Sequence, residues 1–486
     1  CNRCAYVCPH AVIRPVALTA EEAANAPEGM KTLDLTGMKE YKFTMSVSAL
    51  DCTGCGSCVN VCPGKKGAKA LAMENLEASA DEQKYFDYTV KLPVKEDVIA
   101  KFKEATVKGS QFKQPLLEFS GACAGCGETP YAKLITQLFG DRMYIANATG
   151  CSSIWGNSSP STPYTVNAKG QGPAWSNSLF EDNAEFGYGM LLAQRAIRDG
   201  LKAKVEDVVA NGTNEDVKAA GQEWLDTFAV GATNGAATDK LVAALEACGC
   251  DKAKEILAQK DFLAKKSQWI FGGDGWAYDI GFGGVDHVLA SGRDINVMVF
   301  DTEVYSNTGG QSSKSTPTGA IAQFAAGGKE TKKKDMASIA MSYGYVYVAQ
   351  ISMGADFNQT VKAIAEAEAY PGPSLIIAYA PCINHGIKKG MSKAQTEEQL
   401  AVECGYWNNF RYNPAAEGDK FSLDSKAPKA EGYQDFLNGE VRYNALKRAN
   451  PAKADKLFAL NEQEAMERYD YLNKLVTVYA AEKEDK

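Results

Sequence analysis

Several features that define whole classes of proteins are missing from this sequence. No apolar run approaches the roughly 20 residues that a membrane helix needs, and the N-terminus has neither a signal-peptide pattern nor an initiator methionine. The net charge of −8 disfavours nucleic-acid binding, and the basic run at 332–334 is expected in a solvated loop. Histidine is rare (His10, His287 and His385), so imidazole catalysis has few candidates. We expect a cytoplasmic protein that binds neither membranes nor nucleic acid, and a truncated or processed chain.

Cysteine is too scarce for a disulfide-stabilised scaffold, and it clusters at the spacing of metal ligands. The 14 cysteines fall well below the ~8–10% typical of disulfide scaffolds. A complete C-x2-C-x2-C-x3-C-P run lies at 52–63, and residues 1–9 match the last three cysteines of another. Bacterial-type ferredoxins hold two [4Fe–4S] clusters with two such runs, and the fourth cysteine of each run serves the other cluster. The cysteines of these runs are Cys1, Cys4, Cys8, Cys52, Cys55, Cys58 and Cys62.

The rest of the chain has an α/β pattern. We expect a small α+β ferredoxin-like domain at 1–76, truncated at its N-terminus, and a charged linker at 77–118. Strands separated by helices then predict an α/β domain with a doubly wound, mostly parallel sheet at 119–405. In such sheets ligands bind at the carboxyl ends of the strands. The strand-like runs lie at 141–147, 267–271, 295–300, 345–350 and 374–379, and helical periodicity at 185–198 and 355–369.

Two further segments are distinguished by composition. Residues 201–266 are rich in Ala, Lys and Glu, and they predict a helical insertion within the α/β domain. Residues 406–486 are expected to form a C-terminal extension that ends in a charged helix at 454–484.

A Gly-Asp-Gly loop follows the strand-like run at 267–271. Glycines at a strand end let backbone N–H groups approach a phosphate, and a carboxylate there can hold a divalent cation. Asp274, the Thr302 hydroxyl and the Val304 carbonyl would supply oxygen ligands to Mg2+, and a diphosphate would complete the shell. Gly-Asp-Gly alone is a common turn. The prediction therefore depends on the second polar loop, at 301–311, which ends the next strand.

A third set of cysteines lies inside the α/β region. Cys123 and Cys126 form a C-x2-C pair and Cys151 follows a strand, which gives three of the four thiolates that a [4Fe–4S] cluster needs. Cys382 is the preferred fourth ligand because it follows the strand at 374–379, at the edge where ligands are expected. A zinc site is the alternative. The other cysteines, Cys248, Cys250 and Cys404, are expected to be ordinary surface or structural thiols.

Together these motifs resemble a known enzyme family. CAGCGETPY at 123–131, NATGCSSIWG at 147–156, GGDGWAYDIG at 272–281 and DTEVYSNTGGQ at 301–311 are similar to pyruvate:ferredoxin (flavodoxin) oxidoreductase, over nearly the whole chain. The two glycine-rich loops resemble the thiamine diphosphate signature, with Thr302 where many members have Asn. The resemblance implies oxidative decarboxylation of a 2-oxoacid, giving acetyl-CoA, CO2 and two reduced ferredoxins when the acid is pyruvate.

The same resemblance implies a role for each site residue. The third cysteine set would hold a cluster beside thiamine diphosphate, Asn307 would point toward substrate, and Asp274, Thr302 and Val304 would bind Mg2+. Of the ferredoxin-type clusters, one would use Cys1, Cys4 and Cys62, and the other Cys8, Cys52, Cys55 and Cys58. The implied contacts of thiamine diphosphate are Glu128, Cys151, Gly273, Asp274, Gly275, Trp276, Thr302, Glu303, Val304, Tyr305, Ser306 and Asn307.

Three alternatives stay beside the leading hypothesis. That hypothesis makes the chain the diphosphate-binding and electron-exit part of an enzyme that uses pyruvate and CoA, reduces ferredoxin or flavodoxin, and is a homodimer of the full-length chain. The first alternative changes the substrate to another 2-oxoacid. The second is a polyferredoxin-type electron carrier in which the α/β domain is only a scaffold. The third, a non-oxidative thiamine decarboxylase, would have no use for three clusters.

Overall fold

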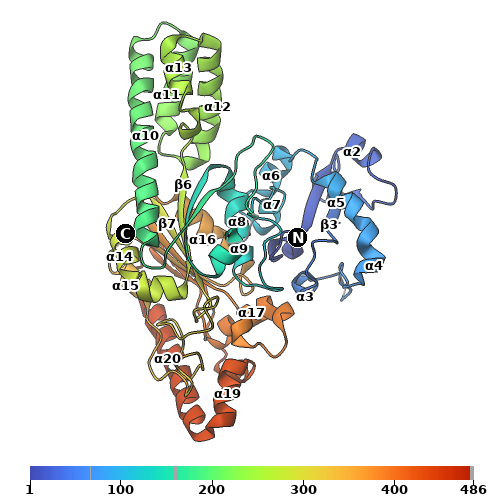
Figure 1. Ribbon diagram of the computed structural model, residues 1–486, viewed down its shortest axis with the longest axis vertical. Coiled ribbons are helices and arrows are strands. Elements are labelled where there is room, and N and C mark those ends of the chain that lie inside the picture. Colours follow the sequence, from blue (N-terminus) through green and yellow to red (C-terminus); the bar gives the residue numbers. More distant parts are fainter. Residues whose placement is uncertain (66, 158–161, 482–486) are drawn as a thin grey trace, which may run out of the picture.

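The computed structural model describes residues 1–65, 67–157 and 162–481. Its first part is a small antiparallel sheet of order β1-β3-β2, next to the main body (Figure 1). Two short helices, one in each N-terminal cysteine run, lie at one end of this sheet, and Cys4 and Cys8 are buried against Val12 and Ile13. The elements are α1 (Arg3–Tyr6), β1 (Ile13–Leu18), α2 (Ala20–Ala24), β2 (Leu33–Asp34), β3 (Lys42–Val47) and α3 (Ser57–Val61).

The segment at 77–118, which the sequence suggested as a linker, is largely helical and shares a core with the small sheet. Val98, Ile99 and Phe112 are buried in one cluster with Ala17 and Leu35. Apolar side chains spaced along short helices build this contact, which makes the segment part of the same packed unit. Its elements are α4 (Leu76–Ser79), a 3-10 turn (Ala80–Glu82), α5 (Gln83–Thr89), α6 (Glu96–Phe102) and α7 (Val107–Ser110).

An eight-stranded sheet of order β11-β10-β8-β9-β7-β6-β4-β5 forms the centre of the molecule. Its six strands from β4 to β9 are parallel, and β10 and β11 continue it as antiparallel edge strands. This confirms the predicted α/β fold with a mostly parallel sheet. The strands are β4 (Met143–Ala148), β5 (Ala174–Ser178), β6 (Ser267–Gly273), β7 (Ile295–Asp301), β8 (Tyr347–Ile351), β9 (Pro373–Tyr379), β10 (Phe410–Tyr412) and β11 (Phe421–Leu423).

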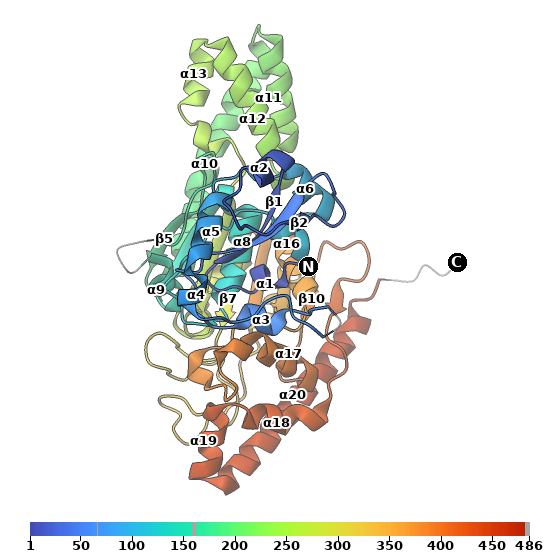
Figure 2. The same cartoon turned by 90° about the vertical axis from the view of Figure 1, so that its right-hand side faces the viewer.

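Helices cover both faces of the sheet, so the central strands are apolar on both sides. Alternate residues of one strand enter different cores: Trp269 and Phe271 of β6 pack on one face, and Ile270 on the other. One core includes α8 and α16, and the other includes α10, α14 and α15 (Figures 1 and 2). The helices are α8 (Thr129–Phe139), α9 (Cys151–Asn157), α14 (Phe282–Ala290), α15 (Met336–Met341) and α16 (Phe357–Ala369), with a π-helical turn at Gly275–Ile280.

The predicted insertion is a helical bundle that projects from the sheet (Figure 1). It has its own core, in which Trp224, Leu241 and Leu245 are buried. Two patterns that the sequence separated, at 185–198 and from 201 onward, form one 29-residue helix, α10. The bundle comprises α10 (Asn183–Asn211), α11 (Glu215–Thr227), α12 (Gly231–Cys248) and α13 (Asp251–Leu257), followed by a 3-10 turn (Lys260–Phe262).

The C-terminal residues are integrated into the main core. Phe410 and Phe421 of the edge strands join the same buried cluster as Tyr433, Leu457 and strand residues of the sheet. The expected terminal helix is α20, and residues 482–484 of that prediction lie outside the described residues. No helix in the described part of the chain is long and apolar enough to cross a membrane. The helices are α17 (Ala394–Cys404), α18 (Tyr433–Asn438), α19 (Val441–Ala449) and α20 (Pro451–Val478), and 3-10 turns lie at Ile383–His385, Met391–Lys393 and Ala430–Gly432.

Candidate cofactor and cluster sites

The loops that follow β4, β6 and β7 meet at the carboxyl edge of the sheet and line one pocket. Parallel strands place their carboxyl ends at the same edge, so segments far apart in sequence converge there. Glu128, at the start of α8, closes the pocket from the side of the third cysteine set. Nine of the twelve residues predicted to contact thiamine diphosphate line it: Glu128, Cys151, Gly273, Gly275, Trp276, Val304, Tyr305, Ser306 and Asn307.

The three residues predicted to hold Mg2+ bring their oxygen atoms together beside this pocket. The Thr302 Oγ1 atom lies 3.0 Å from Asp274 Oδ1 and 3.0 Å from the Val304 carbonyl oxygen. Mg2+ binds six ligands octahedrally at about 2.0–2.1 Å, which separates neighbouring ligands by about 2.9 Å. The distances from the Thr302 hydroxyl to the other two oxygens therefore fit neighbouring corners of a magnesium octahedron.

Asp274 is a fully buried carboxylate whose hydrogen-bond partners are neutral. It accepts hydrogen bonds from the Thr302 backbone N–H (3.2 Å) and the Ser313 hydroxyl (2.6 Å), and its side chain is 0% exposed. Burial raises the pKa of Asp274 well above its usual range, and the nearby Asp301 carboxylate raises it further. A buried anion favours a compensating cation. The donor set and its burial both fit a divalent cation with a diphosphate.

Residues 332–334 form a loop in which Lys332 is exposed, but Lys333 is partly buried and paired rather than solvated. Lys333 Nζ lies 2.9 Å from Asp301 Oδ2 and 2.9 Å from Glu303 Oε1, and both carboxylates are buried. For Lys333 the prediction was wrong because two carboxylates at the end of β7 require a cation, and this lysine supplies it. The composition of the basic run at 332–334 does not reveal an ion pair with residues that lie about 30 positions earlier in the sequence.

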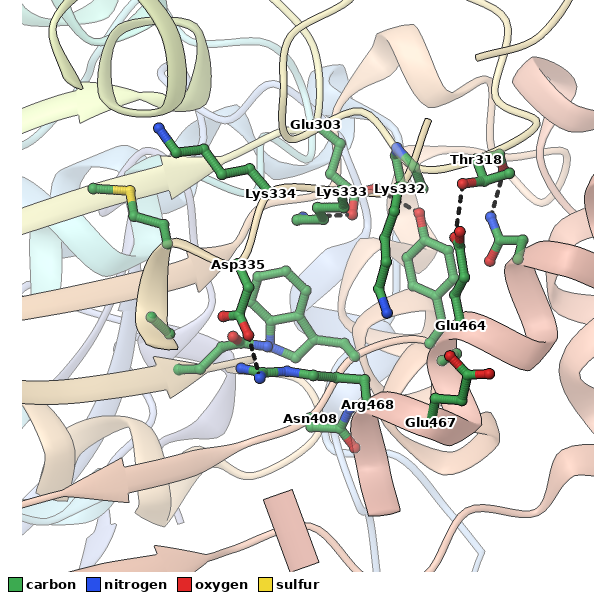
Figure 3. A pocket seen from close by; sticks show the side chains of 18 of the residues that line it. Glu303, Thr318, Lys332, Lys333, Lys334, Asp335, Asn408, Glu464, Glu467 and Arg468 are labelled. Atoms are coloured by element: carbon green, nitrogen blue, oxygen red, sulfur yellow. Dashed lines mark hydrogen bonds and ion pairs between the residues drawn. The ribbon is translucent and has the colours of Figure 1, made fainter. Parts of the chain in front are cut away.

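Glu303 directs its side chain away from the cofactor pocket. Its backbone is left-handed, with φ of 61°, and its carboxylate contacts Lys333 and, at 2.8 Å, Arg442. Burial alone would raise the pKa of Glu303, but these two cations outweigh it and hold the pKa at about 2. The group borders a separate cavity of about 450 Å3 beneath α20 (Figure 3). Of the predicted contacts, Glu303 would reach the cofactor only through its backbone.

The third cysteine set is assembled where α8 begins. The Gly127 N–H donates to the Pro381 carbonyl (3.2 Å), and a Cβ at Gly127 would lie 2.6 Å from Pro381 N, so only glycine allows this approach. This contact joins the C-x2-C loop to the loop of Cys382. Burial is the main cause that raises the pKa of Cys382 to about 12, and Glu128 and the Cys123 thiol add to it. Burial is the main cause that raises the pKa of Cys151, followed by Glu128, and the thiols of Cys382 and Cys126 raise it further.

The cysteines of the ferredoxin-like part lie near one another, and their division between two clusters stays a prediction. Burial raises the pKa of Cys58 to about 12, with further contributions from Cys8 and Cys55, then Cys4. Burial also raises the pKa of Cys4, which has Cys62 as its thiol neighbour. Across the described residues, no group of three or more His, Cys, Asp or Glu side chains is already arranged to hold a metal ion. The thiols are thus neighbours rather than a closed set of ligands.

Of the remaining cysteines, Cys404 is buried, and its thiol faces the Ala401 carbonyl. Cys248 and Cys250 lie on the insertion with their sulfur atoms 2.9 Å apart, away from the carboxyl edge. Neither location lies beside the third cysteine set, and Cys382 as the fourth ligand stays a prediction.

Direct contacts connect the polar loop at 301–311, called the diphosphate loop below, to the third cysteine set. Cys151 Sγ lies 3.0 Å from Ser306 Oγ. The Asn384 side-chain amide donates to the Ser306 carbonyl (3.0 Å) and lies 3.6 Å from Cys382 Sγ. The pocket and the thiols therefore share a wall.

Sequence reasoning missed several polar residues around the site. Trp155 Nε1 donates to the Glu128 carboxylate (2.7 Å), and His385 Nε2 lies 2.7 Å from the Thr302 carbonyl oxygen. Ser313 holds Asp274, and Asn384 joins the two loops. Trp155 lies inside the motif NATGCSSIWG, which was a usable signal, whereas the other contacts depend on tertiary packing.

Comparison with known proteins agrees with this geometry. The family model "Thiamine pyrophosphate enzyme, C-terminal TPP binding domain" matches residues 229–378, and the model "4Fe-4S dicluster domain" matches residues 1–66. The fold and the site thus define a thiamine pyrophosphate enzyme domain joined to a domain for two 4Fe–4S clusters. Along nearly its whole length, the chain is similar to part of the pyruvate:ferredoxin (flavodoxin) oxidoreductases.

Three relatives show this similarity. The chain is 55% identical to pyruvate-flavodoxin oxidoreductase of Klebsiella pneumoniae, over 98% of this chain and 40% of that protein. It is 57% identical to the same enzyme of Enterobacter agglomerans, over 98% of this chain and 41% of that protein. It is 56% identical to pyruvate:ferredoxin oxidoreductase of Moorella thermoacetica, also over 98% and 41%. The chain therefore spans about two fifths of the length of these relatives.

A solved 2-oxoglutarate:ferredoxin oxidoreductase from Magnetococcus marinus aligns with a TM-score of 0.31 and 15% identity, over 55% of this chain and 65% of that one. This similarity is too low to support an argument about the site.

Proposed function

We propose that this chain is the diphosphate-binding and electron-exit part of an enzyme that oxidatively decarboxylates pyruvate to acetyl-CoA and CO2. The observation that carries the proposal is the shared wall between the diphosphate loop and the third cysteine set, built by the contact between Cys151 and Ser306 and by Asn384. A thiamine enzyme that passes on single electrons needs an acceptor next to its cofactor. A non-oxidative decarboxylase has no such need.

The residues that would hold the cofactor follow from their positions. Asp274, the Thr302 hydroxyl and the Val304 carbonyl would bind Mg2+, and Gly273 and Gly275 leave the backbone open to the diphosphate. The third cysteine set would hold a [4Fe–4S] cluster next to the cofactor, and the two N-terminal sets would hold two more.

Thiamine diphosphate, when bound, supplies a nucleophilic carbanion and an electron sink for the loss of CO2. The protein's part is to bind, orient and shield. Trp276 is buried beside the diphosphate loop and keeps water from one side of the pocket. Asn307 lines the pocket mouth and would orient the substrate through its amide. Glu128, with a pKa raised to about 7 by burial, is able to hold a proton near neutral pH.

The partners follow from the same proposal. CoA would accept the acetyl group, and a ferredoxin or flavodoxin would accept electrons from the N-terminal clusters. We include in the proposal a homodimer of the full-length chain and a cytoplasmic location. Another 2-oxoacid as substrate is the nearest alternative, and substrate competition in turnover assays separates the two.

The test is binding of thiamine diphosphate to the full-length protein with and without Mg2+, measured by calorimetry. Asp274→Asn removes one anionic ligand, and we expect binding to weaken by more than about 100-fold. Asp294→Asn is the matched control because Asp294 pairs with Lys265 just before β7, at the opposite edge of the sheet. No Mg2+-dependent binding by the wild type would overturn the proposal and favour the electron carrier. Unchanged binding by Asp274→Asn would overturn the assignment of Asp274 as a Mg2+ ligand.

A further inference from the structure

Lys133 is a buried ammonium group at the junction between the ferredoxin-like part and the main sheet. It lies on α8, is 2% exposed, and donates from Nζ to the backbone carbonyl of Ala5 in α1. Lysine is almost never fully buried unless its charge is paired, and an isolated ammonium in an apolar interior is strongly disfavoured. The site therefore calls for a compensating negative charge.

No carboxylate of the described residues provides that charge. The charged or titratable groups that act on Lys133 are the thiol of Cys8, the guanidinium of Arg14 and the thiol of Cys4. Arg14 has the same sign as Lys133 and is itself paired with Glu118. The two cysteines remain, and the resemblance assigns them to different ferredoxin-type clusters.

We propose that Lys133 tunes electron transfer: the two ferredoxin-type clusters balance its charge, and it raises their reduction potentials. The inference rests on the proposed function, since it needs those clusters. Reduction of a cluster adds one electron and hence one negative charge, with no bond formed or broken. A fixed positive charge in a poorly solvated position stabilises the more negative form. The electron comes from the cluster of the third cysteine set, which is oxidised as its neighbour is reduced.

The placement of α8 makes this role possible. The helix begins at Thr129, three residues after Cys126, and continues past Lys133, so one rigid element spans the third cysteine set and the junction. Around Lys133, the Tyr6 hydroxyl donates to the Phe357 carbonyl (3.1 Å) and the Phe119 N–H donates to the His10 carbonyl (2.9 Å). The first contact joins α1 to the start of α16, and the second joins the loop after α1 to the segment before α8. The ammonium is thereby held beside the route that electrons take outward.

The experiment is a redox titration of the full-length holoprotein, followed by electron paramagnetic resonance. Lys133→Met keeps most of the side-chain volume and removes the charge. We expect the equilibrium constant for reduction of the cluster that includes Cys8 (the Cys8 cluster) to fall at least about tenfold. This corresponds to a reduction potential lower by about 59 mV for one electron. The Cys4 cluster should shift in the same direction, and the third cluster least, because Lys133 contacts Ala5, which lies between Cys4 and Cys8 in the sequence. Lys133→Arg, which keeps the charge, should stay near the wild-type potentials.

Lys113→Met is the control, because this lysine is partly exposed and already paired with Glu104. It should leave all three potentials unchanged. The inference is overturned if Lys133→Met has full iron content and wild-type potentials. If Lys133→Met loses iron, the arginine variant decides: retained clusters support the inference, and lost clusters mean that Lys133 only holds the fold. A wild-type protein without the clusters would instead refute the proposed function.

Discussion

Two buried carboxylates at the cofactor pocket differ in the charge that their surroundings favour. Asp274 has three neutral donors and oxygen neighbours at the spacing of magnesium ligands, so a metal ion would hold it ionised. Glu128 has one donor, Trp155, and burial raises its pKa to about 7. The first group is thus suited to binding a cation, and the second to holding a proton.

Glu128→Gln tests that difference through the pH dependence of stability. Because the pKa of Glu128 is higher in the folded protein than in the unfolded chain, the folded state keeps a proton that the unfolded state loses. Stability is therefore greatest below about pH 4.5 and falls as the pH rises toward about 7, by at most about 3 kcal/mol. Glutamine stays neutral and still accepts from Trp155, so the variant should lose this decline.

Thermal unfolding of the protein without thiamine diphosphate, measured from pH 5 to pH 7, checks this prediction. The variant should become more stable relative to the wild type as the pH rises. Parallel curves for the two proteins would show that Glu128 is already ionised across this range.

At the scale of elements, the parallel sheet was predictable because each central strand is a continuous apolar run. The predicted runs at 267–271 and 295–300 match β6 and β7. Strands buried on both faces are apolar at almost every position, so a continuous apolar run identifies them. The approach of the Thr302 hydroxyl to Asp274 was predictable because both residues follow those strands directly. The pairing of Lys333 with Asp301 and Glu303, and the packing of 77–118 on the small sheet, depend on contacts between distant residues, which local patterns do not encode.

The helical insertion has a separate core, so damage to it should stay local. Trp224 is fully buried, packs against Phe228 with ring centroids 5.1 Å apart, and donates to the Leu263 carbonyl (3.1 Å). Trp224→Ala should destabilise the bundle by about 3–5 kcal/mol. Limited proteolysis with mass mapping should then show faster cleavage within 201–266, and binding of thiamine diphosphate should change less than about twofold.

Trp269→Ala is the matched comparison, because this equally buried tryptophan belongs to β6 and stacks on Phe139. It should weaken binding of thiamine diphosphate as well as stability. If Trp224→Ala reduces binding as much as Trp269→Ala does, the insertion and the sheet unfold as one unit, contrary to the prediction.

At the scale of the whole molecule, three thiol sets lie in an order that leads from the pocket outward. The third set adjoins the diphosphate loop, and α8 continues from it to the junction where Lys133 meets α1. His10 strengthens this junction because its Nδ1 lies 3.0 Å from the Ser120 carbonyl oxygen. His10 follows Cys8 closely in the sequence, and Ser120 closely precedes Cys123. The order of the sets follows from how the two folded parts meet, which no single motif reveals.

Because the sets are separate, their clusters should be lost independently. The intact protein should contain about twelve irons per protomer, for three four-iron clusters. Cys126→Ser and Cys382→Ser should each remove about four irons and leave the magnetic resonance signals of the N-terminal clusters. Cys404→Ser should remove none, because Cys404 is buried away from the third set.

Iron and acid-labile sulfide analysis gives the count. Full iron in Cys382→Ser with a loss in Cys404→Ser would reassign the fourth ligand, and loss of all iron in Cys126→Ser would show that the clusters assemble as one unit.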